Sequence, residues 1–463
     1  MFLQQAPPTN TPFRERPDRT SYQYRYSQSH HITPPLPAAK FPFLLDAPRD
    51  SPFLGPTWYA TMAVLSGNRH RDLRHGDDRL GRLPDQVLVQ IFKTVGAVSK
   101  HDLCSVSRLN MRYHLLADAI LYQTIQFFTP ELHLVFSEGL SRRPRRGSSI
   151  KGIKLAYPAS NLSRLVSNAP IHGSRSRHHS PLPFDSLSQA IATMSNLEVL
   201  DIEVPDALSH GIGQLFNGPF DLACLSSCTL FYQNDHDGYW DLRENIHIFA
   251  HPTLESLTIK RAKFDHRGFD LMERPHETAL SKLQLIECDI NDDGLSDLLM
   301  FPKALREFVM TQTENPVPEL EESSDSIRNY ISALSEQTHS LESIIIDFPS
   351  LRTTRALAMR GFEKLTTLRM SWDHQLFGIS SKKPRLHSVG LPPELKELEF
   401  FNELGTDEEV TDLMVYMLQS LPIMARKLEN LIVVKGQNGV PQDIIDACMG
   451  QDQLSLVSIE SPD

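Results

Sequence analysis

The sequence lacks any apolar run that could cross a membrane. No stretch of about 18 consecutive apolar residues occurs in its 463 residues. The opening segment, residues 1–6, contains no basic cluster followed by an apolar one, as a secretory signal would. We therefore expect a protein that is neither exported nor inserted into a membrane.

Cysteine is also scarce. There are five in the chain, an odd number without dense spacing, which is typical of a reducing compartment. They are Cys104, Cys224, Cys228, Cys288 and Cys448. Cytoplasm or nucleus is the expected location.

Motifs for bond chemistry are missing. The sequence has no Gly-x-x-x-x-Gly-Lys phosphate loop, no Gly-x-Ser-x-Gly elbow and no His-Glu-x-x-His zinc helix. Cys224 and Cys228 have no second Cys or His pair at zinc-ligand spacing, and His178 and His179 would point apart in an extended chain. We expect no enzyme, no cofactor and no metal.

Basic residues are fewer than acidic residues in the second half of the chain. The formal net charge is -11, and from Met272 onward there are 17 basic and 32 acidic residues, a net of -15 that leaves +4 for the rest. This imbalance argues against nucleic acid as a partner. The short basic run Arg142–Arg146 could be a nuclear-import signal or simply an exposed loop.

What is present divides into three segments. Residues 1–78 are rich in Pro, Ser, Arg and Gln without a hydrophobic period, and we expect them to be disordered. Residues 79–128 are predicted to form a helical module, and residues 129–463 a repeat array. Hydrophobic residues make up 40% of the chain, enough for a packed core.

The helical module begins at Leu83. Leu83, Val87 and Ile91 lie on one helical stripe with Leu88, and Pro84 stands in the first turn, where proline is favoured. A second helical pattern of apolar residues runs over residues 106–120. Because a unit of this size buries little surface, we expect it to be stabilised by packing against a partner or a neighbouring domain.

A recurring phrase, Leu-x-x-Leu-x-Leu with other apolar residues substituting, fills the remainder. About eleven copies are separated mostly by 24 to 36 residues, with helical stretches between them such as residues 294–300, 326–334 and 408–418. In the copy that begins at Leu280, Cys288 stands at the buried turn position of the repeat pattern. The copies begin at Ile150, Leu197, Leu225, Leu254, Leu280, Leu305, Leu341, Leu365, Leu395, Leu428 and Leu454. The pattern predicts an α/β fold, an irregular leucine-rich-repeat solenoid with parallel strands on its concave face and helices outside.

Residues interleaved with the inward-pointing positions should face outward from the strands. Their mixture of charged and apolar groups suits a protein target, although any one of them could be merely solvated or covered by a loop. The candidates for target binding are Phe231, Lys260, Arg369, Glu399 and Phe401.

Residues 83–125 resemble the F-box family. The opening phrase, residues 83–92, is similar to the family's Leu-Pro-x-Glu-Val-Leu-x-x-Ile-Phe, with Gln86 in place of the acid. Residues 102–108 and 116–125 resemble the second half, ending in Leu-Tyr-x-x-Ile, whereas Leu109–Tyr113 departs from the usual Cys-Arg-Arg-Phe. Together with the downstream repeats, the overall arrangement resembles fungal F-box proteins.

The resemblance implies a three-helix module that binds a Skp-type adaptor, linked to a cullin scaffold, in a ubiquitin ligase whose target binds the repeats. Apolar residues of the opening phrase would contact the adaptor, unless they only pack internally. They are Leu83, Pro84, Val87, Leu88, Ile91 and Phe92. Two alternatives remain: an interaction scaffold that does not promote ubiquitin transfer, and an enzyme whose site the sequence does not reveal.

Overall fold

The structure is a computed structural model. It describes residues 80–158, 190–205, 222–234, 238–264, 278–312, 326–348, 351, 358–371, 391–403, 408–436, 439–451 and 453–460. The chain divides into two units after Asp78, and every described residue belongs to the second. The predicted tail, residues 1–78, and the pair His178 and His179 lie outside the described residues.

Four short helices open the described part. They are η1 (Leu80–Arg82), α2 (Asp85–Val98), α3 (Lys100–Ser107) and α4 (Met111–Leu121). Ser99 caps α3 by accepting a hydrogen bond from the Asp102 amide, and Asn110 Oδ1 caps α4 by accepting one from the Tyr113 amide at 2.8 Å. The single pattern predicted over residues 106–120 therefore covers two helices, because Asn110 starts a new one.

In the structure the helical module covers Leu80–Tyr122, and the name refers to these residues from here on. Its core is small and separate from the rest of the chain, with Leu88, Phe92, Leu103, Tyr113 and Ala117 as its buried apolar residues. The Phe92 and Tyr113 rings meet edge to face with centroids 5.5 Å apart.

A parallel sheet of twelve strands follows, in which each strand pairs with the next one in its order along the chain. Its strands are β1 (Thr124–Phe127), β2 (Gly152–Ala156), β3 (Val199–Pro205), β4 (Ser227–Gln233), β6 (Ser256–Lys260), β8 (Lys282–Ile286), β10 (Glu307–Thr311), β11 (Ser343–Asp347), β12 (Thr367–Met370), β13 (Glu397–Glu403), β14 (Asn430–Val434) and β15 (Ser455–Ile459). The α/β class is confirmed, and each of the eleven predicted phrases ends in one of these strands. The expected register of the phrase that begins at Leu454 was wrong by one residue: Leu456 pairs with Leu431, so Val457 and Ile459 lie on the exposed face.

The additional strand is β1, which begins at Thr124, before the boundary predicted at residue 128. Its phrase, Tyr122-x-x-Ile125-x-Phe127, has the same apolar spacing as the others. The sequence interpretation had assigned these residues to the helical module alone.

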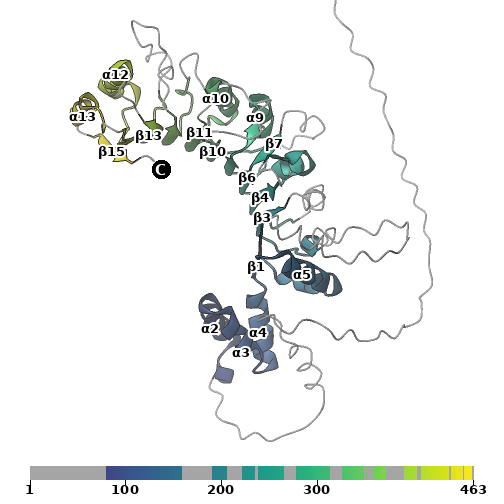
Figure 1. Cartoon of the computed structure of the whole chain (residues 1–463). Coiled ribbons are helices and arrows are strands. Elements are labelled where there is room, and N and C mark those ends of the chain that lie inside the picture. The colour runs from purple at the N-terminus through teal and green to yellow at the C-terminus, as the bar shows by residue number, and fades with distance from the viewer. Residues whose placement is uncertain are drawn as a thin grey trace, which may run out of the picture. The chain divides into compact units, whose positions relative to one another are not determined.

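Helices cover one face of the large sheet. Figure 1 shows α5 (Pro130–Arg142), α9 (Asp292–Leu299), α10 (Ile327–Leu334), α12 (Glu408–Met424) and α13 (Gln442–Met449) on the same side of it. Short 3-10 segments add to this layer: η2 (Pro144–Ser149), η5 (Leu242–Ala250) and η7 (Ser335–Gln337). A second parallel sheet, which the sequence did not predict, contains β5 (Trp240–Asp241), β7 (Ala262–Phe264) and β9 (Asp289–Ile290).

The units stack through one repeated backbone contact just before each strand. The carbonyl of Glu198, for example, accepts hydrogen bonds from the amides of Ser226 and Ser227, and the carbonyl of Ser226 accepts from Glu255 and Ser256. The same contact recurs along the sheet at the carbonyls of Gln123, Lys151, Glu255, Ser281, Arg306, Glu342, Thr366 and Lys396. Each unit is thus joined to its predecessor in the same register.

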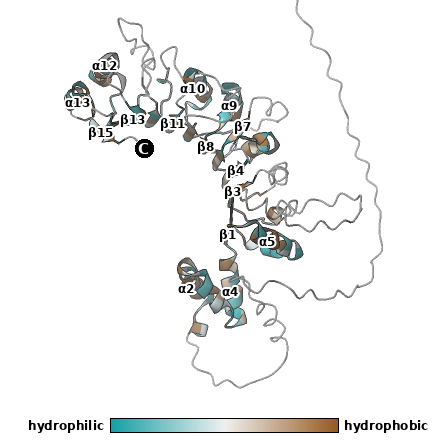
Figure 2. Ribbon diagram, in the orientation of Figure 1, coloured by the Kyte–Doolittle hydropathy of each residue, from teal (hydrophilic) through white to brown (hydrophobic). Residues whose placement is uncertain are grey.

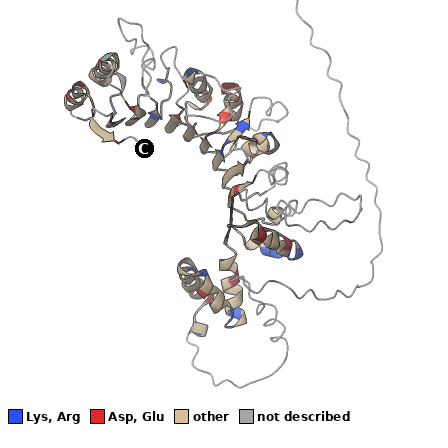
Figure 3. Ribbon diagram, viewed as in Figure 1, with Lys and Arg blue, Asp and Glu red and all other residues tan. Residues whose placement is uncertain are grey.

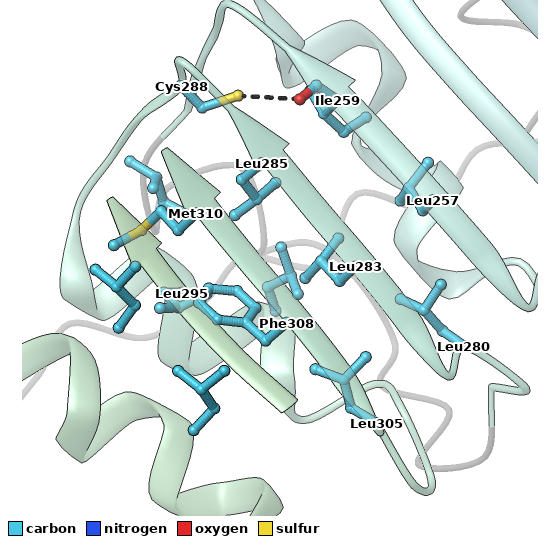
Figure 4. Packing of buried hydrophobic residues seen from close by; sticks show 14 of the residues in the cluster. Leu257, Ile259, Leu280, Leu283, Leu285, Cys288, Leu295, Leu305, Phe308 and Met310 are labelled. Carbon is cyan, nitrogen blue, oxygen red and sulfur yellow. Dashed lines mark hydrogen bonds between the residues drawn. The ribbon is translucent and has the colours of Figure 1, made fainter. Parts of the chain in front are cut away.

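The inward face of every interior strand contributes to one continuous core. In Figure 4, leucines of neighbouring strands lie side by side, with Leu283 next to Phe308 and Leu285 next to Met310. Cys288 Sγ donates to the Ile259 carbonyl at 3.4 Å, so this cysteine fills the buried turn position that the pattern predicted.

Candidate protein-binding surfaces

The six residues expected to contact an adaptor divide into buried and exposed groups. Leu88 is 0% and Phe92 3% exposed, and both belong to the core of the helical module. The expectation that they offer surface to a partner was wrong for these two, because they point toward Tyr113 and Leu103.

The other four residues are accessible to differing degrees. Val87 is 42% exposed, Pro84 is exposed, and Leu83 and Ile91 are half-buried against the module core. Only these four can meet a partner without unpacking the module.

Apolar side chains that the sequence did not single out add to this surface. Figure 2 shows both apolar and polar segments on α2. The largest exposed hydrophobic residues of the module, besides Val87, are Leu80 at 47%, Val98 at 86%, Leu109 at 70%, Met111 at 71% and Leu115 at 62%. The departure at residues 109–113 from the family pattern contains two of them, and it was the signal that could have identified them.

Helix α4 exposes Met111 and Leu115 because its opposite side faces the module core. Tyr113 and Ala117 lie one turn apart and face the core, so Met111 and Leu115, also one turn apart, occupy the opposite side of the helix. Arg112 holds the start of α4 against the start of α2, donating to the carbonyls of Gly81 and Leu83 at 2.6 Å each. An ion pair of 2.7 Å joins Arg112 to Asp85.

The helical module connects to the sheet through several polar contacts. Lys100 Nζ donates to the Thr124 carbonyl at 3.1 Å, and the Arg146 guanidinium lies over the Tyr122 ring, 5.4 Å from its centroid. Within the run Arg142–Arg146, Arg142 pairs with Glu138. Of that run, Arg143 and Arg145 are exposed, whereas Arg146 is half-buried at the junction.

Phe231, Lys260 and Phe401 face outward from the large sheet and are partly exposed. In the register, Phe231 stands between Glu203 on β3 and Lys260 on β6. Lys260 Nζ reaches across β4 to Glu203 Oε1 at 2.6 Å. Lys260 is therefore neutralised within the protein, and it flanks Phe231 instead of standing free.

Arg369 is also paired internally. Its guanidinium lies 3.0 Å from Glu397 Oε1 and 3.1 Å from Glu399 Oε2 on the adjacent strand β13. Glu399 is only 8% exposed, which corrects its expected place on the open surface. Burial raises the pKa of Glu399 above its ordinary value, and the positive charge of Arg369 opposes that shift.

An apolar strip lies between these two ion-pair groups. Val309 on β10 is in register with Ile345 on β11, and both are partly exposed on the outward face. Ile286 on β8 is also partly exposed on that face. Ile345 was among the outward positions of the sequence pattern, whereas Val309 and Ile286 were missed although they follow the same alternation.

Helix α5 buries two polar side chains and exposes two apolar ones. Figure 3 shows acidic and basic residues on this helix. Leu132 and Val135 are 42% and 59% exposed, whereas His133 and Ser137 are fully buried. His133 Nδ1 shares a hydrogen bond of 2.8 Å with the Tyr157 hydroxyl, and burial lowers the pKa of His133 to about 4.

The cysteines are distributed as packing residues. Cys228 is buried, and burial raises the pKa of its thiol, whereas Cys224 is exposed on the preceding turn. Among the residues that the structure describes, no group of three His, Cys, Asp or Glu side chains could hold a metal ion. Within the same ranges, no helix has both the length and the apolar character needed to span a bilayer.

No protein-family model matches the chain, and no curated protein matches it significantly.

Proposed function

We propose that the chain is an F-box protein that serves as the substrate-recognition subunit of a Skp-cullin-F-box ubiquitin ligase. The helical module would be the F-box and would bind the Skp-type adaptor. The large sheet with its covering helices would be an irregular leucine-rich-repeat solenoid that binds a target protein. The chain itself would perform no bond chemistry.

The observation that carries this proposal is the number of exposed apolar side chains on the helical module. It closes on five buried apolar residues while leaving six large apolar side chains more than a third exposed. Burying a side chain of this size contributes about 1.5 to 3 kcal/mol, so a partner that covered several of them would bind firmly. The resemblance of residues 83–125 to the F-box supports a Skp-type adaptor as that partner.

The burial pattern changes which residues we assign to the adaptor. Leu88 and Phe92 would support α2 from inside, and Pro84, Val87 and the half-buried Ile91 would touch the partner. Met111 and Leu115 on the outer side of α4 are further candidates, as large exposed apolar side chains of the same module.

The target surface would be the apolar strip of Ile286, Val309 and Ile345 together with Phe231 and Phe401. Lys260 and Arg369 would act less by charge, because each is already paired with a carboxylate of its own chain. Once bound there, a target would gain a high effective concentration near the ubiquitin-loaded enzyme.

A double substitution on the exposed part of the helical module tests the adaptor assignment. Val87→Asp with Leu115→Asp places two carboxylates on exposed positions, so the module should still fold. We expect at least tenfold weaker retention of a purified Skp-type adaptor in a pull-down, because charged groups would then have to be desolvated in the interface. Thermal unfolding measured by circular dichroism should be nearly unchanged.

Val135→Asp is the matched control. Val135 is 59% exposed, close to the 62% of Leu115, but it lies on α5, outside the helical module. It should leave adaptor retention intact. The proposal fails if the wild-type chain retains no adaptor, or if the double variant retains as much as the control.

Cullin recruitment separates a ligase subunit from a scaffold without ubiquitin transfer. The full chain, the adaptor and a cullin are mixed and separated by size. Co-elution of all three supports the ligase subunit, and a stable pair with the adaptor that excludes the cullin supports the scaffold.

A further inference from the structure

Strand β15 forms one edge of the large sheet. It pairs with β14 on one side, and no described strand pairs with its other side. The Ser455 amide donates to Glu429 and the Ile459 carbonyl accepts from Lys435, so residues 455, 457 and 459 direct their backbone groups toward β14. By alternation, the amides and carbonyls of Leu456 and Ser458 point to the open side.

This edge carries none of the features that usually prevent strand addition. Residues 453–459 contain no charge and no proline, and the register between β14 and β15 runs without a bulge. Two of its apolar side chains are accessible, with Val457 at 41% and Ile459 at 36% exposed. The helix that packs against β15, α13, exposes Met449 at 78% close to the same end of the sheet.

The strand is complementary to a second copy of itself in one antiparallel register. Placing Val457 on a two-fold axis pairs Leu456 with Ser458 of the other copy, and those are the residues whose backbone groups are open. The amides and carbonyls of these pairs can then form four hydrogen bonds. Ile459 meets Ser455, and Val457 meets its own equivalent on the same face.

Charge restricts where a second copy can approach. Residues 272–463 carry a net of -15, so two copies repel one another over most of this region. The neutral seam of β15 is a place where two identical chains can approach without setting like charges opposite each other.

We propose that the chain forms a two-fold dimer by antiparallel pairing of β15 with β15 of a second copy. The two large sheets would become one continuous sheet across the axis. Each dimer would present two outward sheet faces, so a target with two binding segments could be held at both. This inference does not depend on the identity of the adaptor.

Sedimentation of the full chain over a wide concentration range tests the dimer. We expect a reversible change from 52.5 kDa to twice that mass. Ser458→Pro removes one open-side amide without touching the ladder to β14, and it should weaken the dimer at least tenfold. Thr229→Lys, an outward position on the interior strand β4, is the control and should leave the mass unchanged.

A charge exchange at the axis excludes simple misfolding. Val457→Lys and Val457→Glu each place like charges opposite one another, and each variant alone should be monomeric. An equal mixture of the two should dimerise again, because Lys then faces Glu. A chain that stays at 52.5 kDa at every concentration overturns the proposal. So does a dimer that neither Ser458→Pro nor the charge variants weaken.

Discussion

His133 is the residue whose ionisation the fold opposes most clearly. It lies on the inner side of α5, stacked on Tyr157 with 5.5 Å between ring centroids, and its Nε2 has no hydrogen-bond partner among the described residues. Protonation would place a charge in an apolar environment, which is why burial lowers the pKa of His133 to about 4. The negative charge of Glu131 opposes this shift.

Stability should therefore depend on pH through His133. In the unfolded chain the imidazole takes up a proton near its ordinary pKa of 6.5, whereas in the folded chain it does so only near about 4. The free energy of unfolding is thus greatest above pH 6.5 and falls as the pH drops to about 4, by about 3 kcal/mol from this residue. Urea unfolding at several pH values measures it.

His133→Asn should flatten this pH dependence, since asparagine can still bond to Tyr157 but does not titrate. His101→Asn, at a side chain 89% exposed, should leave the dependence as in the wild type. An unchanged slope in His133→Asn would show that other groups cause the pH dependence.

Among the described elements, η2 has the tightest packing at a glycine. A Cβ on Gly147 would lie 2.8 Å from the Thr193 carbonyl carbon and nearer still to its oxygen. That space is filled by the backbone of the segment leading to β3, which cannot yield as a flexible side chain would. Gly139 in α5 is the opposite case, with nothing within 4 Å of an added Cβ.

The two glycines should respond to alanine with opposite signs. Gly147→Ala should lower the free energy of unfolding by about 2 kcal/mol or more, because backbone must move. Gly139→Ala should raise it by about 0.5 to 1 kcal/mol, because glycine is unfavourable inside an exposed helix. Denaturant titration of both variants measures these changes in the free energy of unfolding. Equal effects would contradict the close approach at η2.

Considered as a whole, the described chain contains two separate apolar cores. The helical module closes on five buried residues of its own, whereas the large sheet and its helices share one core from Phe127 to Cys448. Because its core buries little surface, the helical module should have a lower free energy of local unfolding than the interior strands of the large sheet.

Phe92→Ala should make this difference visible. Loss of the Phe92 ring, which meets Tyr113 edge to face, should cost about 3 to 5 kcal/mol within the module. Hydrogen exchange should accelerate for amides of α2, α3 and α4 while the amides of β8 and β10 keep their protection. A uniform loss of protection over both regions would mean that the two cores unfold as one.

The positions of the strands follow from the sequence alone. The apolar alternation is local, so residues two apart point to the same side wherever the segment is extended. Each of the eleven predicted phrases lies at a strand, and the first ten share one register. The last phrase is displaced by one residue, because Leu456 and not Val457 pairs with Leu431. The same reasoning found the buried Cys288 and the helices near residues 294–300, 326–334 and 408–418. It did not find the break at Asn110, where one capping side chain divides a continuous apolar pattern.

Which residues remain available to a partner depends on how the elements pack in three dimensions. Leu88 and Val87 are adjacent in one apolar stripe, yet only Leu88 faces the core, because the position of α4 determines which side of α2 is covered. Lys260 and Glu203 are 57 residues apart and become an ion pair through the register of three strands. Such pairings arise from the stacking of units, and a local pattern carries no information about which distant side chain the stack brings near.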